Sequence, residues 1–443
     1  MEAQPNRRSV VFTALGIFWG CLLVYHANGR PHAGFDTVGA PYTAWAMVRH
    51  GSLDLQTYRE LERFVGPTIF ELRDGRWVSF RPPGVALAVV PFVAPLAAFR
   101  EEPVGITAMH HLGKLAAAAH VAGAAVLFFL MCRRLVPTAA WPATILFAFG
   151  TTLYSVASQA SWQHGPTTFW LTLALYLLTD CTKEMGVKRG LFVGLALGMA
   201  VLTRPPAVFF LAATGGAFLC QRRWRGALGL TLGSAALLAL YCAFNFHYFG
   251  DPFRGGYARD NWEMPTPLWL GVGGLLVAPS RGVLVYSPAL LLVPWGVRRL
   301  FAKDEWARAD NRLILVGWLG ASAATLLLFA KWYDWRGGWC YGPRFLTETM
   351  PVCCLLFGYA YVGLSLRWVQ GVAVALVGLS VYVHAVGIFG HAAETDWCCR
   401  HDKPDQGRCL FEVRDTQIAA YTLATVQSLS RRFGGQANEG MSP

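Results

Sequence analysis

The sequence contains a series of long apolar runs with almost no charged residue, and this feature restricts the possible folds more than any other. Several runs of about 15–22 residues carry no Asp, Glu, Lys or Arg, which is the length that an α-helix needs to cross a bilayer. Only 14% of the residues are charged, against about a quarter in soluble domains, and 54% are hydrophobic. The chain is therefore predicted to be an all-α polytopic membrane protein.

The apolar runs define about eleven predicted transmembrane helices. They cover residues 9–26, 107–131, 136–157, 163–181, 190–203, 206–220, 226–247, 282–298, 312–331, 346–366 and 369–390. The first run is expected to be retained as a helix, because no small-x-small cleavage motif follows it.

The formal net charge of +12 is distributed in short basic groups between these runs. The groups are Arg7-Arg8, Arg133-Arg134, Lys183 to Arg189, Arg222 to Arg225 and Arg298-Arg299. A nucleic-acid-binding protein would gather its basic residues on one soluble surface, so nucleic acid is not an expected partner. The groups instead follow the positive-inside rule. This rule places the N-terminus in the cytoplasm, and the outer segments are then 27–106, 158–165, 203–206, 247–282, 332–344 and 391–443.

The first outer loop, residues 27–106, is too long for a simple connector and is expected to be functional. Residues 35–51 (FDTVGAPYTAWAMVRHG) and 53–64 (LDLQTYRELERF) place apolar residues at helical spacing, which predicts amphipathic helices lying on the membrane. Residues 83–99 form a short apolar run with three Pro, which predicts a kinked, partly inserted helix on the outer side.

Several motifs recur in a recognisable order between residues 10 and 390. They are Asp36 in FDT, Arg81-Pro82-Pro83 in FRPPG, then SQASWQHGP, LTRPP, GDPFRGGY, APSRGVLVYSP and WRGGWCYGPRF. This order resembles the GT-C glycosyltransferases, a class that includes protein O-mannosyltransferases and aminoarabinose transferases of lipid A. In those families an Asp or Glu follows the first helix, and a Lys/Arg-Pro-Pro turn closes the first outer loop.

The resemblance implies a GT-C-like transmembrane glycosyltransferase domain over residues 1–390, with 391–443 as an outer-side tail. It also implies an integral protein of the bacterial inner membrane with its active site on the outer, periplasmic face. The expected reaction moves a sugar from a polyprenyl-phosphate-linked donor to a hydroxyl of a lipid, glycan or protein acceptor. The donor sugar and the acceptor stay open.

This reaction requires a base for the acceptor hydroxyl, whereas the phosphate leaves as an anion and needs no acid. Asp36 is the predicted base; its alternative role is to cap the helix at 35–51, shared with Thr37. Many family members carry a second acidic residue in the second outer loop, where this chain has His164. His164 is expected to hydrogen-bond the acceptor or assist the base, or simply to cap a helix. This departure argues against a two-carboxylate or metal-assisted site, so no metal or other cofactor is expected.

Arginine is the expected ligand of the donor phosphate, because its planar fork binds phosphate oxygens bidentately. Arg residues on the predicted outer side run against the positive-inside bias, and the candidates among them are Arg81, Arg204, Arg254, Arg281, Arg336 and Arg344. Arg281 is interpreted as the anchor of a helix end, and snorkelling is the alternative for Arg204. Tyr257 is a further candidate for orienting a phosphate or sugar hydroxyl, with an interface tyrosine as the alternative.

Residues 332–345 (WYDWRGGWCYGPRF) separate two apolar runs. The three Trp are typical of the water–lipid boundary, whereas the Gly residues permit tight turns and the two Arg are available for phosphate. The segment is therefore predicted to be a donor-phosphate loop, with Asp334 as a further member.

The tail contains Cys398, Cys399 and Cys409, which favour a disulfide over a metal site on an oxidising side, with the pairing undetermined. Residues 418–433 predict one more surface helix. Two functions from other classes remain as alternatives: a polytopic transporter or lipid flippase, and a scaffold whose Arg and Trp residues only anchor the interface.

Overall fold

The computed structural model describes residues 7–65, 69–72, 74–180, 185–253, 255–256, 264–302, 309–390 and 408–434, which are mostly helical. The helices in the first half are α1 (Arg7–His26), α2 (Phe35–His50), α3 (Pro83–Ala97), α4 (Ile106–Leu135), α5 (Ala140–Phe149), α6 (His164–Leu178), α7 (Val187–Thr203) and α8 (Val208–Cys220). The helices in the second half are α9 (Trp224–Phe249), α10 (Leu268–Val277), α11 (Val283–Tyr286), α12 (Val293–Leu300), α13 (Ala309–Lys331), α14 (Met350–Val362), α15 (Arg367–Phe389) and α17 (Gln417–Gly434).

Six helical segments of the described chain are long and apolar enough to cross a membrane. They are Arg8–His26, Ile106–Leu135, Trp224–Phe249, Asn311–Lys331, Arg344–Val362 and Arg367–Phe389. These agree with six of the predicted spans. The other predicted spans correspond to shorter helices or broken segments, so the count of about eleven stays a prediction.

Two predicted spans are not continuous helices. Within 282–298 the chain forms α11, then a 3₁₀ turn at Pro288–Leu292, then α12. Proline lacks the amide hydrogen and its ring clashes with the preceding turn, so Pro288 breaks the helix. Within 136–157, α5 ends at Phe149 with Gly150 as its C-cap, and a π-helical turn follows at Leu153–Ala157.

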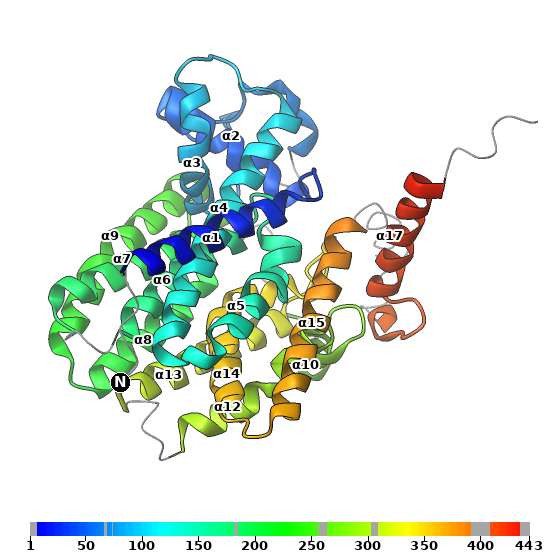
Figure 1. Cartoon of the computed structure of the whole chain (residues 1–443). Coiled ribbons are helices and arrows are strands. Elements are labelled where there is room, and N and C mark those ends of the chain that lie inside the picture. The colour runs from blue at the N-terminus through cyan, green and yellow to red at the C-terminus, as the bar shows by residue number, and fades with distance from the viewer. Residues whose placement is uncertain are drawn as a thin grey trace, which may run out of the picture.

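The first outer loop folds into a lobe formed by α2, α3, a small hairpin and the beginning of α4. Figure 1 shows α2 and α3 above the remaining helices. The prediction that 35–51 lies on the membrane surface is wrong: the segment is helical, but residues 37–46 are all buried because α2 packs against both α3 and α4. The predicted second amphipathic helix is also wrong, since 53–64 contains only a 3₁₀ helix, Arg59–Phe64.

Two short antiparallel strands, β1 (Ile69–Glu71) and β2 (Trp77–Ser79), complete this lobe and qualify the all-α prediction. Residues 83–99 are helical as predicted, with Pro91 and Pro95 inside α3. The strand β2 leads directly to Arg81, so the hairpin fixes where that arginine lies.

Helices α7 and α9 pack tightly through glycines on both surfaces. Gly190 and Gly194 of α7 face Gly229 and Gly233 of α9, and each Gly approaches a backbone oxygen of the other helix. A Cβ built on Gly229 would lie 2.1 Å from the carbonyl oxygen of Val187. Small residues at four-residue spacing allow such backbone contact between membrane helices.

We expect Gly229→Ala to destabilise the protein by about 1–3 kcal/mol, because the added methyl group forces these helices apart. The matched control is Gly216→Ala in α8, where a Cβ meets nothing within 4 Å. Thermal unfolding of both variants in detergent should show a lower Tm for Gly229→Ala alone. Equal midpoints would contradict the tight contact.

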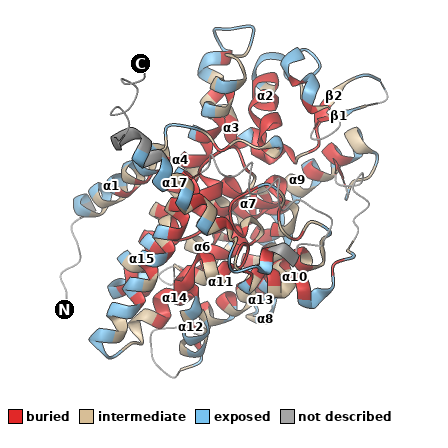
Figure 2. Ribbon diagram, turned by 90° about the vertical axis from the view of Figure 1, so that its right-hand side faces the viewer, coloured by how far each residue is buried: buried red, intermediate tan, exposed pale blue. Residues whose placement is uncertain are grey.

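The core runs through the centre of the helical bundle, and the exposed residues, pale blue in Figure 2, lie mostly on its rim. The exposed rim includes large apolar residues such as Phe12, Trp19, Leu232 and Trp368, which suits contact with lipid. Helix α17 packs against α15 at the edge of the bundle (Figure 1).

Candidate active site

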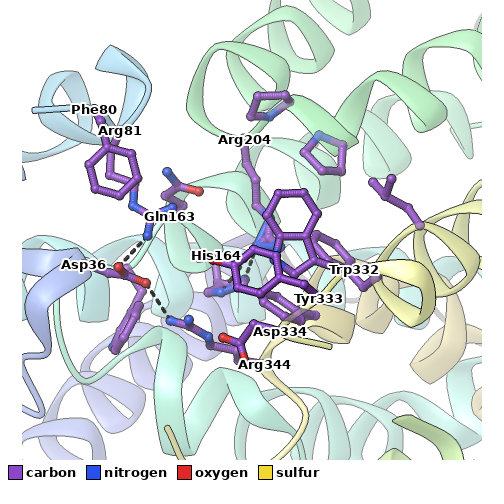
Figure 3. A pocket seen from close by; sticks show the side chains of 16 residues that line it. Asp36, Phe80, Arg81, Gln163, His164, Arg204, Trp332, Tyr333, Asp334 and Arg344 are labelled. Atoms are coloured by element: carbon purple, nitrogen blue, oxygen red, sulfur yellow. Dashed lines mark hydrogen bonds and ion pairs between the residues drawn. The ribbon is translucent and has the colours of Figure 1, made fainter. Parts of the chain in front are cut away.

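A cavity of about 320 Å³ lies where the α2–α3 lobe meets the bundle. Figure 3 shows Asp36, Arg81, His164, Arg204 and Arg344 around it. The full lining is Asp36, Phe80, Arg81, Trp162, Gln163, His164, Arg204, Pro205, Pro206, Leu328, Phe329, Trp332, Tyr333, Asp334, Arg344 and Phe345. Residues from five separate parts of the chain thus converge, and each part carries one of the motifs noted in the sequence.

Asp36 enters this cavity from the first turn of α2. The N-cap of the helix is Gly34, which makes no side-chain cap hydrogen bond. The alternative role of Asp36 as an N-cap is therefore wrong. Its carboxylate is in the first turn, where the helix dipole favours a negative charge, and its side chain is 25% exposed.

Two arginines hold the Asp36 carboxylate from opposite sides. Nη2 of Arg81 donates to Oδ1, and Nη1 of Arg344 donates to Oδ2 at 3.0 Å; both contacts are drawn in Figure 3. Burial raises the pKa of Asp36, but the Arg81 and Arg344 guanidiniums outweigh burial and hold it below its usual range.

The same arginines lie on aromatic rings. The guanidinium of Arg81 is 4.3 Å from the centre of the Phe80 ring, and that of Arg344 is 4.7 Å from the Trp162 ring. Stacking of this kind stabilises and orients a guanidinium. Within the described residues, the buried Nε of Arg344 has no hydrogen-bond acceptor.

Arg204, His164 and Glu348 form a second, more deeply buried cluster. Nδ1 of His164 lies 2.7 Å from Oε1 of Glu348, and Nη1 of Arg204 donates to the same oxygen at 3.2 Å. Arg204 is also 2.8 Å from Nδ1 of His164. Arg204 is 4% exposed and stacks on Phe329, so the snorkelling alternative is wrong.

Glu348 is a candidate site residue that the sequence motifs did not identify. It is 2% exposed and supplies the negative charge that balances Arg204. A signal was present: Glu348 is an ionisable residue inside the predicted span 346–366, and such residues are functional by default. Its Oε2 is buried and makes no hydrogen bond with any part of the chain that the structure describes.

The loop at 332–345 turns through three glycines with positive φ, Gly337, Gly338 and Gly342. Only glycine adopts this region readily, which confirms the interpretation of the loop as a tightly turned segment. Trp332 lines the cavity, whereas Trp335 is buried against Gly274 of α10. The assignment of Trp335 to the water–lipid boundary is therefore wrong.

Asp334 and Arg336 lie near the beginning of this loop. Asp334 lines the cavity, and its Oδ1 is 3.5 Å from Nε of Arg336. Burial raises the pKa of Asp334, in spite of the nearby Arg336 and Arg344 guanidiniums. Arg336 itself is not part of the cavity lining.

The remaining predicted site residues have other positions. Arg281 is buried and donates to the backbone oxygens of Arg336 and Gly338, so its contacts are with the 332–345 loop, whereas the sequence predicted the anchor of a helix end. Arg254 and Tyr257 lie outside the described residues, as do Cys398 and Cys399. Among the residues that the structure does describe, no three His, Cys, Asp or Glu side chains are grouped to hold a metal.

An apolar surface continues from the cavity along the outside of the lobe. A small hollow beside Arg81 is lined by Leu53, Pro83 and Phe244 among others, and these three residues also border a groove of about 570 Å³ between the lobe and α9. The groove is almost wholly apolar, with Leu87, Val90 and Leu240 in its walls. The small hollow thus shares Arg81 with the charged cavity and three residues with a groove that suits a hydrocarbon chain.

Comparison with known proteins identifies similar folds but no close relative. No family model matches the sequence, and no curated protein matches it. ArnT from Cupriavidus metallidurans bound to undecaprenyl phosphate is 13% identical with a TM-score of 0.53, and the match covers 98% of this chain and 80% of that chain. The archaeal oligosaccharyltransferase AglB from Archaeoglobus fulgidus, in complex with an inhibitory peptide and a dolichol-phosphate, is 12% identical with a TM-score of 0.53.

The match to AglB covers 91% of this chain and 60% of the AglB chain. ArnT in its apo state is 14% identical, also with a TM-score of 0.53. These matches show that the chain shares its fold with ArnT and AglB.

Proposed function

We propose that this protein transfers a sugar from a polyprenyl-phosphate-linked donor to an acceptor hydroxyl at the outer, periplasmic face of the membrane. Asp36 is the general base, and Arg81 and Arg344 bind the donor phosphate. The observation that carries the proposal is the single carboxylate of Asp36 held between two arginines at the wall of one cavity. This arrangement supplies one base and two phosphate ligands, which is what the reaction requires.

The apolar groove supports a lipid-linked donor rather than a soluble one. The groove is lined by residues of α3 and α9, and it shares Leu53, Pro83 and Phe244 with the small hollow that Arg81 lines. A polyprenyl chain that lies in the groove and passes these three residues would bring its phosphate toward Arg81. ArnT binds undecaprenyl phosphate according to its structure, and the AglB complex contains a dolichol-phosphate. Both neighbours therefore bind ligands of the proposed chemical class.

The position of the cavity supports a site at the outer face. Helix α4 starts in the lobe, and Gly113 near its start packs against Pro41 and Ser161. Its last turn carries Arg133 and Arg134, about 30 Å further along the helix at 1.5 Å per residue. The basic, cytoplasmic-type end of α4 is thus separated from the cavity by about the thickness of a bilayer.

Donor binding explains how a carboxylate with a low pKa becomes a base. A phosphate that enters the cavity competes with Asp36 for the N–H groups of Arg81 and Arg344. As hydrogen bonds shift from the carboxylate to the phosphate, the pKa of Asp36 rises. Asp36 then takes a proton more readily from the hydroxyl group of the acceptor. The acceptor hydroxyl is then deprotonated only when the donor is in place.

The pH dependence of kcat/KM follows from the same contacts. Because its folded-state pKa is lowered, Asp36 stays ionised in the free enzyme down to below about pH 4, the ordinary range of an aspartate. We expect no acidic decline of kcat/KM for the donor between about pH 8 and pH 5. A decline near pH 6 would assign the base to another group, such as Asp334.

The test is a transfer assay with purified protein in vesicles that contain polyprenyl-phosphate sugars as donors. Incorporation of labelled sugar into added lipid, glycan or peptide acceptors would support the proposal. Absence of transfer with every donor, together with movement of the lipid between leaflets, would instead support a flippase. Direct binding of polyprenyl phosphate, measured by native mass spectrometry, separates a failed acceptor choice from a failed donor assignment.

A further inference from the structure

Gln417, the first residue of α17, is buried against the 332–345 loop, which carries Arg344. Gln417 is 0% exposed, although the helix that it begins lies at the edge of the bundle. Its side-chain Oε1 accepts hydrogen bonds from Tyr286 Oη at 3.0 Å, from the Gly342 amide at 3.1 Å and from Nη1 of Arg281. Its Nε2 donates to the carbonyl of Cys340 at 3.0 Å.

The side chain of Gln417 is therefore fully used in hydrogen bonds to buried groups around the 332–345 loop. The backbone at the start of α17 is also held by hydrogen bonds. The Gln417 amide donates to Oγ of Ser280 at 3.1 Å, and the Ser280 amide donates to the carbonyl of Leu410 at 3.2 Å. A solvated surface helix needs no such contacts, because water would satisfy a glutamine at its start.

Gln417 and Arg281 together hold the backbone of the loop on both sides of its glycines. Arg281 donates to the carbonyls of Arg336 and Gly338, and Gln417 binds Cys340 and Gly342. Positive-φ glycines leave a segment with many alternative conformations, so the conformation observed depends on these external contacts.

The held segment ends directly at Arg344. Pro343 is the only residue between Gly342 and Arg344. The Arg344 side chain also packs on the loop: a Cβ on Gly337 would lie 3.2 Å from its Cγ and Nε. A shift of the loop would therefore move the guanidinium that binds Asp36.

We infer that Gln417 is a positioning residue for the proposed transfer reaction. Through this residue, α17 holds positions 336–342 of the 332–345 loop and thereby places Arg344 at the donor phosphate. The inference rests on the proposed function for its kinetic consequence, but the loop contact itself is testable without any activity. Gln417 touches neither donor nor acceptor; it acts through Arg344.

The activity-independent test uses the thiol of Cys340, which is buried and lies next to the Gln417 contact. In Gln417→Ala the loop should open more often, so alkylation of Cys340, located by mass spectrometry of its peptide, should rise several-fold. The matched control is Gln427→Ala on the exposed face of the same helix, which should leave labelling unchanged. Unchanged labelling in Gln417→Ala would overturn the inference.

The kinetic test uses the transfer assay. We expect Gln417→Ala to reduce kcat/KM for the donor about tenfold to a hundredfold, in line with the loss of several buried hydrogen bonds. Gln417→Glu keeps an oxygen that accepts hydrogen bonds from Tyr286 and Gly342, but it lacks the N–H group that donates to Cys340. The decrease in kcat/KM should therefore be intermediate. This second variant also guards against a folding failure of Gln417→Ala.

A double-mutant cycle separates positioning from general destabilisation. The Gln417→Ala loss should disappear in an Arg344→Ala background, because the residue through which it acts is gone. It should persist in an Arg81→Ala background, since Arg81 follows β2 and belongs to a different segment from the one that Gln417 holds. Equal losses in both backgrounds would overturn the link to Arg344. If wild type shows no transfer at all, the proposed function fails, whereas the Cys340 result still decides the loop contact.

Discussion

Asp36→Asn should reduce kcat for sugar transfer by about 10²–10⁴-fold, the usual contribution of a positioned general base. The amide is nearly the same size as the carboxylate, so the cavity keeps its shape. It has no negative charge to share with Arg81 and Arg344, and both arginines become more available to the donor. We therefore expect polyprenyl phosphate to bind Asp36→Asn at least as tightly as it binds wild type.

A general base that is removed lowers kcat but leaves donor binding intact, whereas a phosphate ligand that is removed weakens donor binding. The two measurements together therefore distinguish these roles for Asp36. The measurements are initial rates at saturating donor and the donor Kd by native mass spectrometry. Asp74→Asn is the matched control, because Asp74 is in the same outer segment but its side chain is 53% exposed and pairs with Arg76 at the surface. Unchanged transfer by Asp36→Asn would refute the base assignment and direct attention to Asp334, whose pKa burial raises.

Arg344→Ala should produce the second large effect. Arg344 binds Asp36, stacks on Trp162 and has a buried Nε that faces no acceptor in the described chain. Loss of charge-assisted hydrogen bonds to a phosphate costs about 1.5–3 kcal/mol, which is roughly a tenfold to hundredfold increase in the donor Kd. The kcat should fall as well, because Asp36 loses one of the two groups that orient it.

Arg344→Lys should recover only part of this loss, because an ammonium group keeps the charge but not the planar fork. Arg100→Ala, an exposed arginine of the same lobe, controls for a general change in surface charge. Donor Kd and kcat would be compared for the three variants. A full recovery with lysine would show that charge alone is required, and an unchanged Kd in Arg344→Ala would remove this residue from the phosphate site.

Much of the site could be predicted from the sequence because its parts are local motifs. Asp36, Arg81, His164, Arg204 and Arg344 were each recognisable from short stretches, and the structure brings all five to one cavity. Glu348 and Gln417 were missed for a common reason. Neither belongs to a motif, and each is defined by partners more than 70 residues away in the chain.

The errors in the fold have a related cause. Apolar periodicity in residues 35–51 predicts a helix correctly, but it does not show whether one or both faces are covered. Residues 37–46 of α2 are all buried because α3, α4 and β2 pack against this helix. Likewise, hydropathy predicts an apolar segment at 282–298, whereas Pro288 and the contacts of the following turn determine that it is broken.

The sequence by itself therefore determines that the chain belongs in a membrane, because its long uncharged runs need a lipid environment. It also shows which charged groups its motifs contain, namely one Asp and several Arg. Only the tertiary structure decides which charges are paired. Arg204 is balanced by Glu348, whereas Arg81 and Arg344 share Asp36. Pairing depends on distances of a few ångströms between segments that are far apart in the chain, and no local pattern encodes those distances.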